Sequence, residues 1–264
     1  QLRVEADGSF ENIGSAYTIQ NSDLGSLKNL TVTKANVEAI TGYSQDDELT
    51  WNAIITDRAG NATTGTASGT TLDVDVSSPT VDAITSTAGY YKLNESVNIV
   101  VSFTENIAIT GTPQLVMKTD NSPGSGTATI DKSGLSGDNV TFAYTVGSTH
   151  YSTALDYATP ADDLKLNSGT ITDAAGNNAT LTLPNTGTLP GQTVVRVDGI
   201  VPDAFNTGTV VTIGDSVVAG YLNADTTGID VTVPIANDAS LENGKLYIQA
   251  KIGGNAFANV TSAY

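Results

Sequence analysis

Short runs of β-branched and aromatic residues, each bounded by turn residues, recur along the whole chain. Examples are ELTWNAIITD (Glu48–Asp57), NIVVSFTE (Asn98–Glu105) and NVTFAYTV (Asn139–Val146). GIDVTVPIAND (Gly228–Asp238) alternates apolar and polar positions with the period of two that half-buried strands show. No stretch combines a 3.6-residue hydrophobic period with helix caps. Several short strands at intervals of about ten residues predict an all-β fold of antiparallel sandwiches.

Two proline-marked junctions divide the chain, VDVSSPT (Val74–Thr80) and VDGIVPD (Val197–Asp203). Strand pairing should pause at each, because proline has no backbone N–H to donate to a ladder. The middle segment, 79–200, is long enough for one complete Ig-like sandwich, which takes about 100 residues. The flanking segments, 1–76 and 203–264, are too short for the same plan.

The two ends of the chain resemble each other. FENIGSAY (Phe10–Tyr17) and FANVTSAY (Phe257–Tyr264) share five of eight residues. The preceding QLRVEADG (Gln1–Gly8) and YIQAKIGG (Tyr247–Gly254) also align if the second hairpin is one residue longer. A self-match at a long fixed spacing indicates a tandem repeat. We therefore expect 203–264 to be the N-terminal part of a domain of the same type as 1–76. Residues 1–76 are then the C-terminal part of such a domain, and its early strands should come from a preceding repeat or an adjacent copy.

A turn motif also recurs, as TDRAGN (Thr56–Asn61) and TDAAGN (Thr172–Asn177). Each copy follows an apolar strand and precedes a threonine-rich strand that leads into an Asp-x-x-x-Pro junction. In these features, and in SFTENIAITGTPQL and VAGYLNADTTGIDVTVPIANDASL, nearly the whole chain resembles the bacterial Ig-like repeats of giant secreted or cell-surface adhesins. The resemblance implies tandem Ig-like antiparallel β-sandwiches, arranged as an extended rod outside the cell and binding calcium.

The composition restricts the partners. The chain has 28 acidic and 11 basic residues, a net charge of −17, and no cysteine. This charge repels phosphates, so nucleic acids and anionic membrane surfaces are excluded as partners. It suits divalent cations. No run of about 18 apolar residues exists, so we expect no membrane insertion in this segment.

Strand order predicts where acidic side chains gather. In a seven-stranded sandwich, the loops after the second and sixth strands lie beside the preceding linker. The predicted second strand, NIVVSFTE, ends in Glu105 and leads into Asn106, and the predicted sixth, LKLNSGTIT (Leu164–Thr172), leads into Asp173. The linker adds Asp73 and Asp75, which should share a face because strand side chains alternate. Calcium takes six to eight oxygen ligands from such groups, so the sequence predicts a calcium site here. The alternative is that these are ordinary turn residues of an acidic surface.

The second junction should behave in the same way. Asp198 belongs to its linker, and Asn237 and Asp238 end the predicted second strand of the last segment. The sixth-strand loop of that domain has its counterpart in Asp57, which would serve a linker in another copy. We include these four residues as further candidate calcium ligands.

The favoured function is a non-enzymatic structural or adhesive repeat of a long extracellular, cell-surface or secreted protein, stiffened by calcium. His150 is the only histidine, and without cysteine it indicates neither a zinc site nor a catalytic triad. The expected partners are neighbouring repeats or adjacent copies, and a host-surface, glycan or matrix ligand. Two alternatives stay open: a building block of a surface filament or S-layer, and a carbohydrate-binding accessory module of a larger secreted protein.

Overall fold

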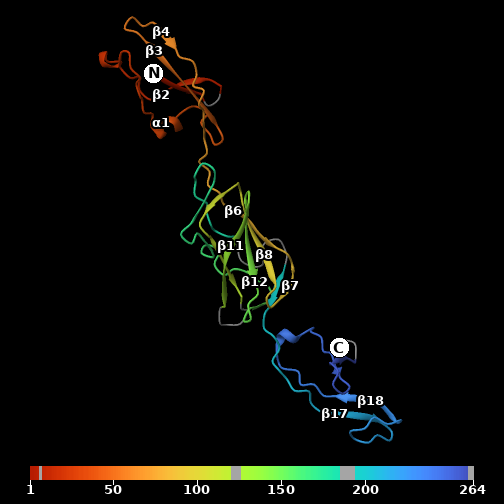
Figure 1. Ribbon diagram of the computed structural model, residues 1–264. Coiled ribbons are helices and arrows are strands. Elements are labelled where there is room, and N and C mark those ends of the chain that lie inside the picture. The colour runs from red at the N-terminus through yellow and green to blue at the C-terminus, as the bar shows by residue number, and fades with distance from the viewer. Residues whose placement is uncertain (6–7, 120–125, 185–193, 261–264) are drawn as a thin grey trace. The chain divides into compact units, whose positions relative to one another are not determined.

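The computed structural model describes residues 1–5, 8–119, 126–184 and 194–260, and these are organised almost entirely by strands (Figure 1). The all-β prediction is therefore confirmed. The chain forms two compact units that do not follow the sequence junctions. The first comprises Gln1–Thr80, Phe103–Thr110 and Gly169–Thr180, and the second comprises Val81–Ser102, Gly111–Ser168 and Leu181–Tyr264.

The first unit contains one antiparallel sheet in the order β2-β1-β3-β4, with β5 also paired to β3. A separate two-stranded pairing joins β9 to β15. The strands are Leu2–Glu5 (β1), Phe10–Ile13 (β2), Glu48–Thr56 (β3), Ala62–Thr64 (β4), Leu72–Asp73 (β5), Ala108–Thr110 (β9) and Thr170–Thr172 (β15). The described residues of 1–76 thus make a single sheet and do not close into a seven-stranded sandwich.

One face of this sheet is apolar. Strand alternation turns Val4 inward, where it is fully buried opposite Trp51 of β3. The buried cluster consists of Val4, Ile13, Ile40, Leu49 and Val74. Trp51, whose pattern predicts a core position, is only partly buried against it. A single sheet covered by loops therefore provides a small core.

A short helix, α1 (Lys34–Glu38), interrupts the strands of the first unit, although the sequence predicts no helix. Its N-cap is Thr33, whose hydroxyl accepts a hydrogen bond from the backbone N–H of Asn36 at 3.3 Å. Five residues make little more than one turn, which is too short to display a 3.6-residue period. A single-turn 3₁₀ helix, η1 (Asn21–Asp23), precedes it.

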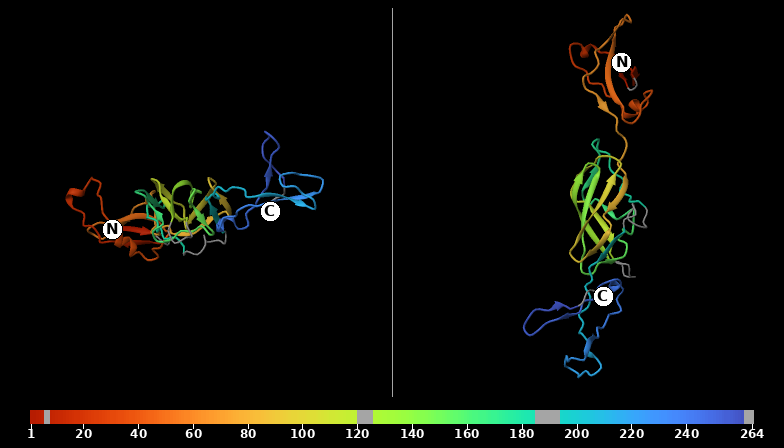
Figure 2. Two further views of the ribbon diagram at one scale, coloured as in Figure 1. Left: turned by 90° about the horizontal axis from the view of Figure 1, so that it is seen from below. Right: turned by 90° about the vertical axis from the view of Figure 1, so that its right-hand side faces the viewer.

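The second unit holds a six-stranded sheet and a three-stranded sheet. Their orders are β14-β10-β11-β12-β8-β6 and β13-β16-β7, and the long strands lie side by side in both views of Figure 2. The strands are Val81–Ser86 (β6), Gly89–Lys92 (β7), Ser96–Phe103 (β8), Gln114–Lys118 (β10), Thr127–Ser136 (β11), Asn139–Thr145 (β12), Tyr151–Ser152 (β13), Leu164–Lys165 (β14) and Val195–Asp198 (β16).

Alternation along these strands builds the larger core. Val97, Ile99 and Val101 of β8 are buried, and so are Phe142 and Tyr144 of β12, while the residues between them are partly or fully exposed. β8 and β12 are antiparallel neighbours across seven residue pairs. The hydrophobic pattern therefore predicts correctly which face of each strand is buried.

Two details of the predicted sandwich are wrong. β16 runs parallel to β7, with Val195 opposite Gly89, although only antiparallel pairs were expected. The predicted sixth strand, LKLNSGTIT, is split into β14 and β15, which pair with different strands. Asn167 and Ser168 between them have positive φ angles of 48° and 63°, so the backbone turns sharply and cannot continue as one strand.

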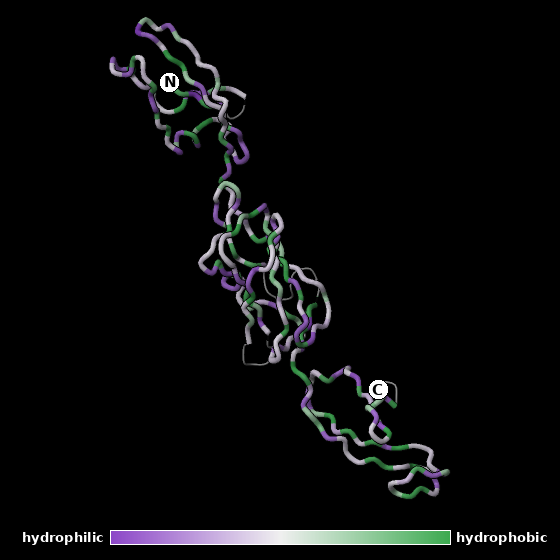
Figure 3. Tube along the Cα trace, viewed as in Figure 1, coloured by the Kyte–Doolittle hydropathy of each residue, from purple (hydrophilic) through white to green (hydrophobic). Residues whose placement is uncertain are grey.

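The segment from residue 203 onward forms two separate hairpins, along which Figure 3 shows hydrophobic stretches. One pairs β17 (Val210–Gly214) with β18 (Thr226–Val231), and the other pairs β19 (Gln249–Ala250) with β20 (Ala258–Asn259). A 3₁₀ turn, η2 (Ala239–Leu241), lies between them. No residue is buried among 203–238 and 240–260. The repeat residues Thr261–Tyr264 lie outside the described range.

The recurring turn motif has the same construction in both copies. In the first, Asp57 Oδ1 accepts from the backbone N–H groups of Ala59 and Asn61, both at 2.8 Å, and Asn61 Nδ2 donates to Asp57 Oδ2 at 2.8 Å. Side-chain and backbone hydrogen bonds from Asn61 lower the pKa of Asp57. Gly60 has φ +94°, as does Gly176 of the second copy. Both copies contain an aspartate that accepts from backbone N–H groups, a glycine with a positive φ, and an asparagine whose side chain donates to the aspartate.

We predict that Gly60→Ala lowers the free energy of unfolding by about 1–2 kcal/mol, because an L-residue is strained at this φ. A Cβ at Gly60 would meet no atom within 4 Å, so the loss would come from the backbone alone. Gly65→Ala is the matched control, since Gly65 lacks a positive φ and its added Cβ would make ordinary contact at 3.5 Å. Urea unfolding should show a loss for Gly60→Ala only; equal losses would contradict this account.

Candidate metal site

Three of the predicted calcium ligands come together in the first unit. Carboxylate oxygens of Asp75, Glu105 and Asp173 all lie within 4.8 Å of one another. Asp75 follows β5, Glu105 follows β8 and Asp173 follows β15, so three distant segments of the chain each contribute one acid. Asp173 is buried, with 4% of its surface exposed, and the other two are half-buried.

The second TDAAGN turn holds Asp173 in place. Its Oδ1 accepts from the backbone N–H groups of Gly176 at 2.7 Å and Asn177 at 2.8 Å, and its Oδ2 accepts from Asn177 Nδ2 at 2.9 Å. Burial raises the pKa of Asp173, but hydrogen bonds led by those of Asn177 outweigh it and leave the pKa below its usual value. The folded turn therefore favours the ionised form of Asp173.

Asp75 is fixed from two sides. Gln45 Nε2 donates to Asp75 Oδ1 at 2.9 Å, and the backbone N–H of Ser77 donates to the same oxygen at 3.2 Å. The Asp75 carbonyl accepts from Asn177 Nδ2 at 3.2 Å, so one asparagine contacts both acidic segments. These contacts hold two of the three carboxylates together before any ion is considered.

Of the three acids, Glu105 is held by the fewest contacts. Its carboxylate has no hydrogen-bond partner among the described residues, unlike those of Asp75 and Asp173. Partial burial raises the pKa of Glu105, and the negative charges of Asp173, Asp75 and Asp46 raise it further. Repulsion from its acidic neighbours therefore disfavours the ionised form of Glu105, and a bound cation would relieve that repulsion.

The spacing of the oxygens fits one calcium ion. Calcium binds oxygen at about 2.3–2.6 Å, so ligands on opposite sides of an ion lie about 5 Å apart. One carboxylate oxygen from each of the three residues lies within 4.8 Å of the other two, which agrees with that span. Among the described residues, this is the one group of three or more acidic, histidine or cysteine side chains that could hold a metal ion.

Asp73 does not join this group, contrary to the prediction. β5 ends at Asp73, so strand alternation no longer relates its side chain to that of Asp75. Asp73 is instead exposed and lies opposite Glu48 of β3. Asn106, the neighbour of Glu105, is also exposed.

The candidates of the second junction have local roles as turn residues. Asp198 ends β16 and accepts from the backbone N–H of Ile200 at 3.0 Å. Asp238 accepts from the backbone N–H of Ser240 at 2.9 Å, and Asn237 beside it is exposed. Asp57 is exposed and serves its own turn. Within the described ranges, none of the four belongs to a group of three acids.

Sequence reasoning missed three residues around the acidic group. Gln45 contacts Asp75, and its Nε2 also donates to Asp46 Oδ1 at 3.0 Å. Asp46 has a positive φ of 69° and adds its charge to the field at Glu105. Asn177 contacts Asp75 and Asp173. Of these, only Asn177 had a signal, its place at the end of the repeated turn motif.

No described helix is long and apolar enough to cross a membrane. Comparison with known proteins identifies no family, because no family model, curated protein or solved structure matches the chain.

Proposed function

We propose that this chain is a non-enzymatic structural and adhesive repeat of a long extracellular protein, in which calcium stiffens the junction that follows residues 1–76. The observation that carries the proposal is the meeting of Asp75, Glu105 and Asp173 within 4.8 Å. Tandem Ig-like sandwiches, a cell-surface or secreted location and an adhesion ligand belong to the same proposal. They are supported by the strand-rich fold, the repeated turn and the acidic net charge.

The acidic group has the chemistry that calcium requires. Carboxylate and carbonyl oxygens are its preferred ligands, and it tolerates the irregular geometry of loops. Asp75, Glu105 and Asp173 would hold the ion, and Gln45 and Asn177 would keep two of these carboxylates in position. Bound calcium would supply positive charge that ties three chain segments together.

We predict that the effect of Glu105→Gln on stability changes sign with calcium. Without metal, the variant should match or exceed the wild type, because it removes a charge that its neighbours repel. With millimolar calcium, the wild type should gain stability by mass action, about 2.7 kcal/mol at a hundred times the dissociation constant. The variant should lose most of that gain. Thermal melts in chelator and in calcium measure both effects.

Asp82→Asn is the control for this test, since Asp82 is an exposed carboxylate of β6 outside the acidic group. It should keep the full calcium-dependent rise in melting temperature. A wild type whose melting temperature ignores calcium would show that the acidic group is ordinary surface.

A second prediction concerns pH in the absence of metal. The folded-state pKa of Glu105 is raised, so its ionised form destabilises the fold above that pKa. The stability advantage of Glu105→Gln should therefore be full at pH 7, decrease as pH falls through the raised pKa, and vanish below the ordinary glutamate value of about 4.3. Urea unfolding of metal-free protein across this range provides the measurement. An advantage that persists at low pH would assign it to packing.

A third prediction concerns the junction itself. Chelation should leave the apolar cores folded but free the segment that carries Asp75 from the loops that carry Glu105 and Asp173. Small-angle scattering should then record a shorter maximum dimension in chelator than in calcium, with unchanged β-type circular dichroism. Glu105→Gln should show the shorter dimension even in calcium. Equal dimensions under both conditions would contradict a stiffening role.

A further inference from the structure

The first unit has an open groove beside β1 and β2, lined by a mixture of apolar and polar residues. A hollow of about 300 Å³ is lined there by Leu2, Ile13, Tyr17, Leu30 and Val32 together with small and polar residues. β2 ends the sheet order, so its outer edge has no strand partner in the described chain. Such an edge, next to a hollow that offers apolar side chains, is suited to pairing with another strand.

The opposite wall of the groove also has a free backbone. None of the N–H and C=O groups of residues 27–32 bonds another backbone group in the described part of the chain. Leu27 in this stretch is fully exposed, and Leu24 before it is 69% exposed. Of this segment, residues 30–32 line the groove itself, and the exposed leucines lie just before them.

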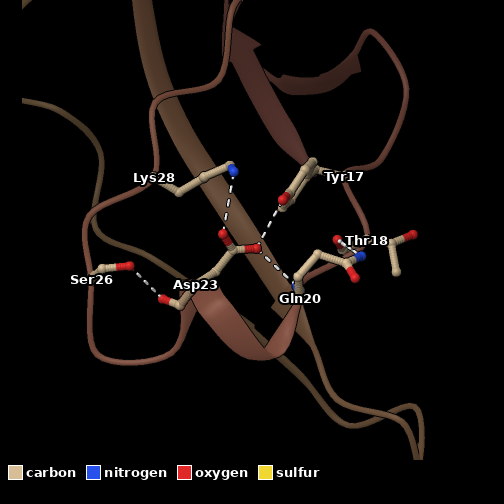
Figure 4. Close-up of polar contacts among 6 residues, drawn as sticks. All are labelled: Tyr17, Thr18, Gln20, Asp23, Ser26 and Lys28. Atoms are coloured by element: carbon tan, nitrogen blue, oxygen red, sulfur yellow. Dashed lines mark hydrogen bonds and ion pairs between the residues drawn. The ribbon is translucent and has the colours of Figure 1, made fainter.

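The wall is nevertheless held in a defined shape by Asp23 (Figure 4). Asp23 accepts from Tyr17 Oη and from the backbone N–H of Gln20, both at 2.8 Å, and pairs with Lys28 Nζ at 3.2 Å. Ser26 Oγ donates to the Asp23 carbonyl at 2.8 Å. The hydrogen bond from Gln20, followed by that from Tyr17, lowers the pKa of Asp23. Among these residues Tyr17 lines the groove, so its bond to Asp23 holds one of the lining side chains in place.

Residues 203–246 contain a hairpin whose apolar side chains are exposed. β17 and β18 form an isolated hairpin, and isolated two-stranded hairpins are at best marginally stable in water. On one face of it Val210 lies opposite Val231 and Thr212 opposite Ile229. Val210 and Ile229 are 62% and 47% exposed. This face of the hairpin therefore leaves apolar side chains exposed to solvent.

Both units also contain buried polar atoms without a hydrogen-bond partner, although none of their residues lines the groove. Buried side-chain nitrogen and oxygen atoms nearly always have a hydrogen-bond partner. In the described residues, those without one are Arg3 Nε, Trp51 Nε1, Asn52 Oδ1 and Thr212 Oγ1. The first three belong to β1 and β3 of the first unit, and Thr212 belongs to β17.

The internal repeat identifies what should cover the groove. Under the sequence alignment, Gln249 and Asn259 are the counterparts of Arg3 and Asn12. Arg3 lies opposite Asn12 in the first hairpin, and Gln249 lies opposite Asn259 in the second. The two hairpins thus share one register. Since residues 203–246 directly precede the second hairpin, a segment of that kind belongs beside the first.

We propose that residues 203–246 of a second copy of this chain occupy the groove of the first unit and add strands to its sheet. The contact joins the tail of one molecule to the head of the next, so it is heterologous and can extend to further copies. It rests on the repeat and the exposed strands and uses none of the three acids of the candidate metal site.

Sedimentation of the full chain over a dilution series tests the proposal. The mean mass should rise with concentration beyond that of a dimer, because each bound copy exposes a new groove and a new hairpin. The rise should be the same in calcium and in chelator. A wild type that stays monomeric would overturn the proposal, and association that requires calcium would assign the contact to the acidic group instead.

Two variants test the pairing itself. Leu30→Asp places a charge in the groove, and Ile229→Asp places one on the hairpin; both sites are already solvent-exposed in the single chain. Each variant alone should remain monomeric. Mixed in equal amounts they should form a dimer and stop there, because each molecule keeps one intact surface. Rescue on mixing also shows that each variant still folds.

Leu135→Asp is the control, since Leu135 is an exposed leucine of β11 outside both surfaces. It should associate as the wild type does. If either single variant still forms long assemblies, or the mixture stays monomeric while the control associates, the proposed pairing is wrong.

Discussion

The constraint on which this structure depends is that a strand must satisfy its backbone at both edges and cover its apolar face. The six-stranded sheet of the second unit meets it with long antiparallel ladders and fully buried side chains such as Ile99 and Phe142. The sheet of residues 1–76 meets it in part, with a small core around Val4. The described hairpins after residue 203 contain no buried residue. Stability should therefore differ greatly along the chain.

The acidic group is governed by a second constraint, the repulsion between neighbouring carboxylates. Hydrogen bonds within its turn favour the ionised form of Asp173. The negative charge of Asp173 in turn makes ionisation of Glu105 less favourable. A fold that maximised stability alone would not place an unsupported glutamate there. A bound cation would relieve this repulsion, and the calcium proposal rests on that.

The sequence predicted strand positions and buried faces well, because alternation in segments such as β8 and β12 reports local geometry. The expected strand order also predicted that the carboxylates of Asp75, Glu105 and Asp173 would lie close together, and they do. It failed where tertiary context decided, as at Asp73, where β5 ends too early for alternation to hold. The parallel pairing of β16 with β7 and the contact of Gln45 with Asp75 join residues far apart in sequence, and no local pattern contains them.

The contrast between β12 and β18 shows what alternation leaves out. Both strands alternate apolar and polar residues, yet Phe142 of β12 is fully buried whereas Ile229 of β18 is half exposed. Periodicity predicts which face of a strand needs covering, but not where the covering layer comes from. For β12 that layer lies in the same unit. For β18 the proposed covering layer is the first unit of a second copy, and the signal for it is non-local, namely the register that the two terminal hairpins share. The repeat thus supplies the pairing information that periodicity lacks.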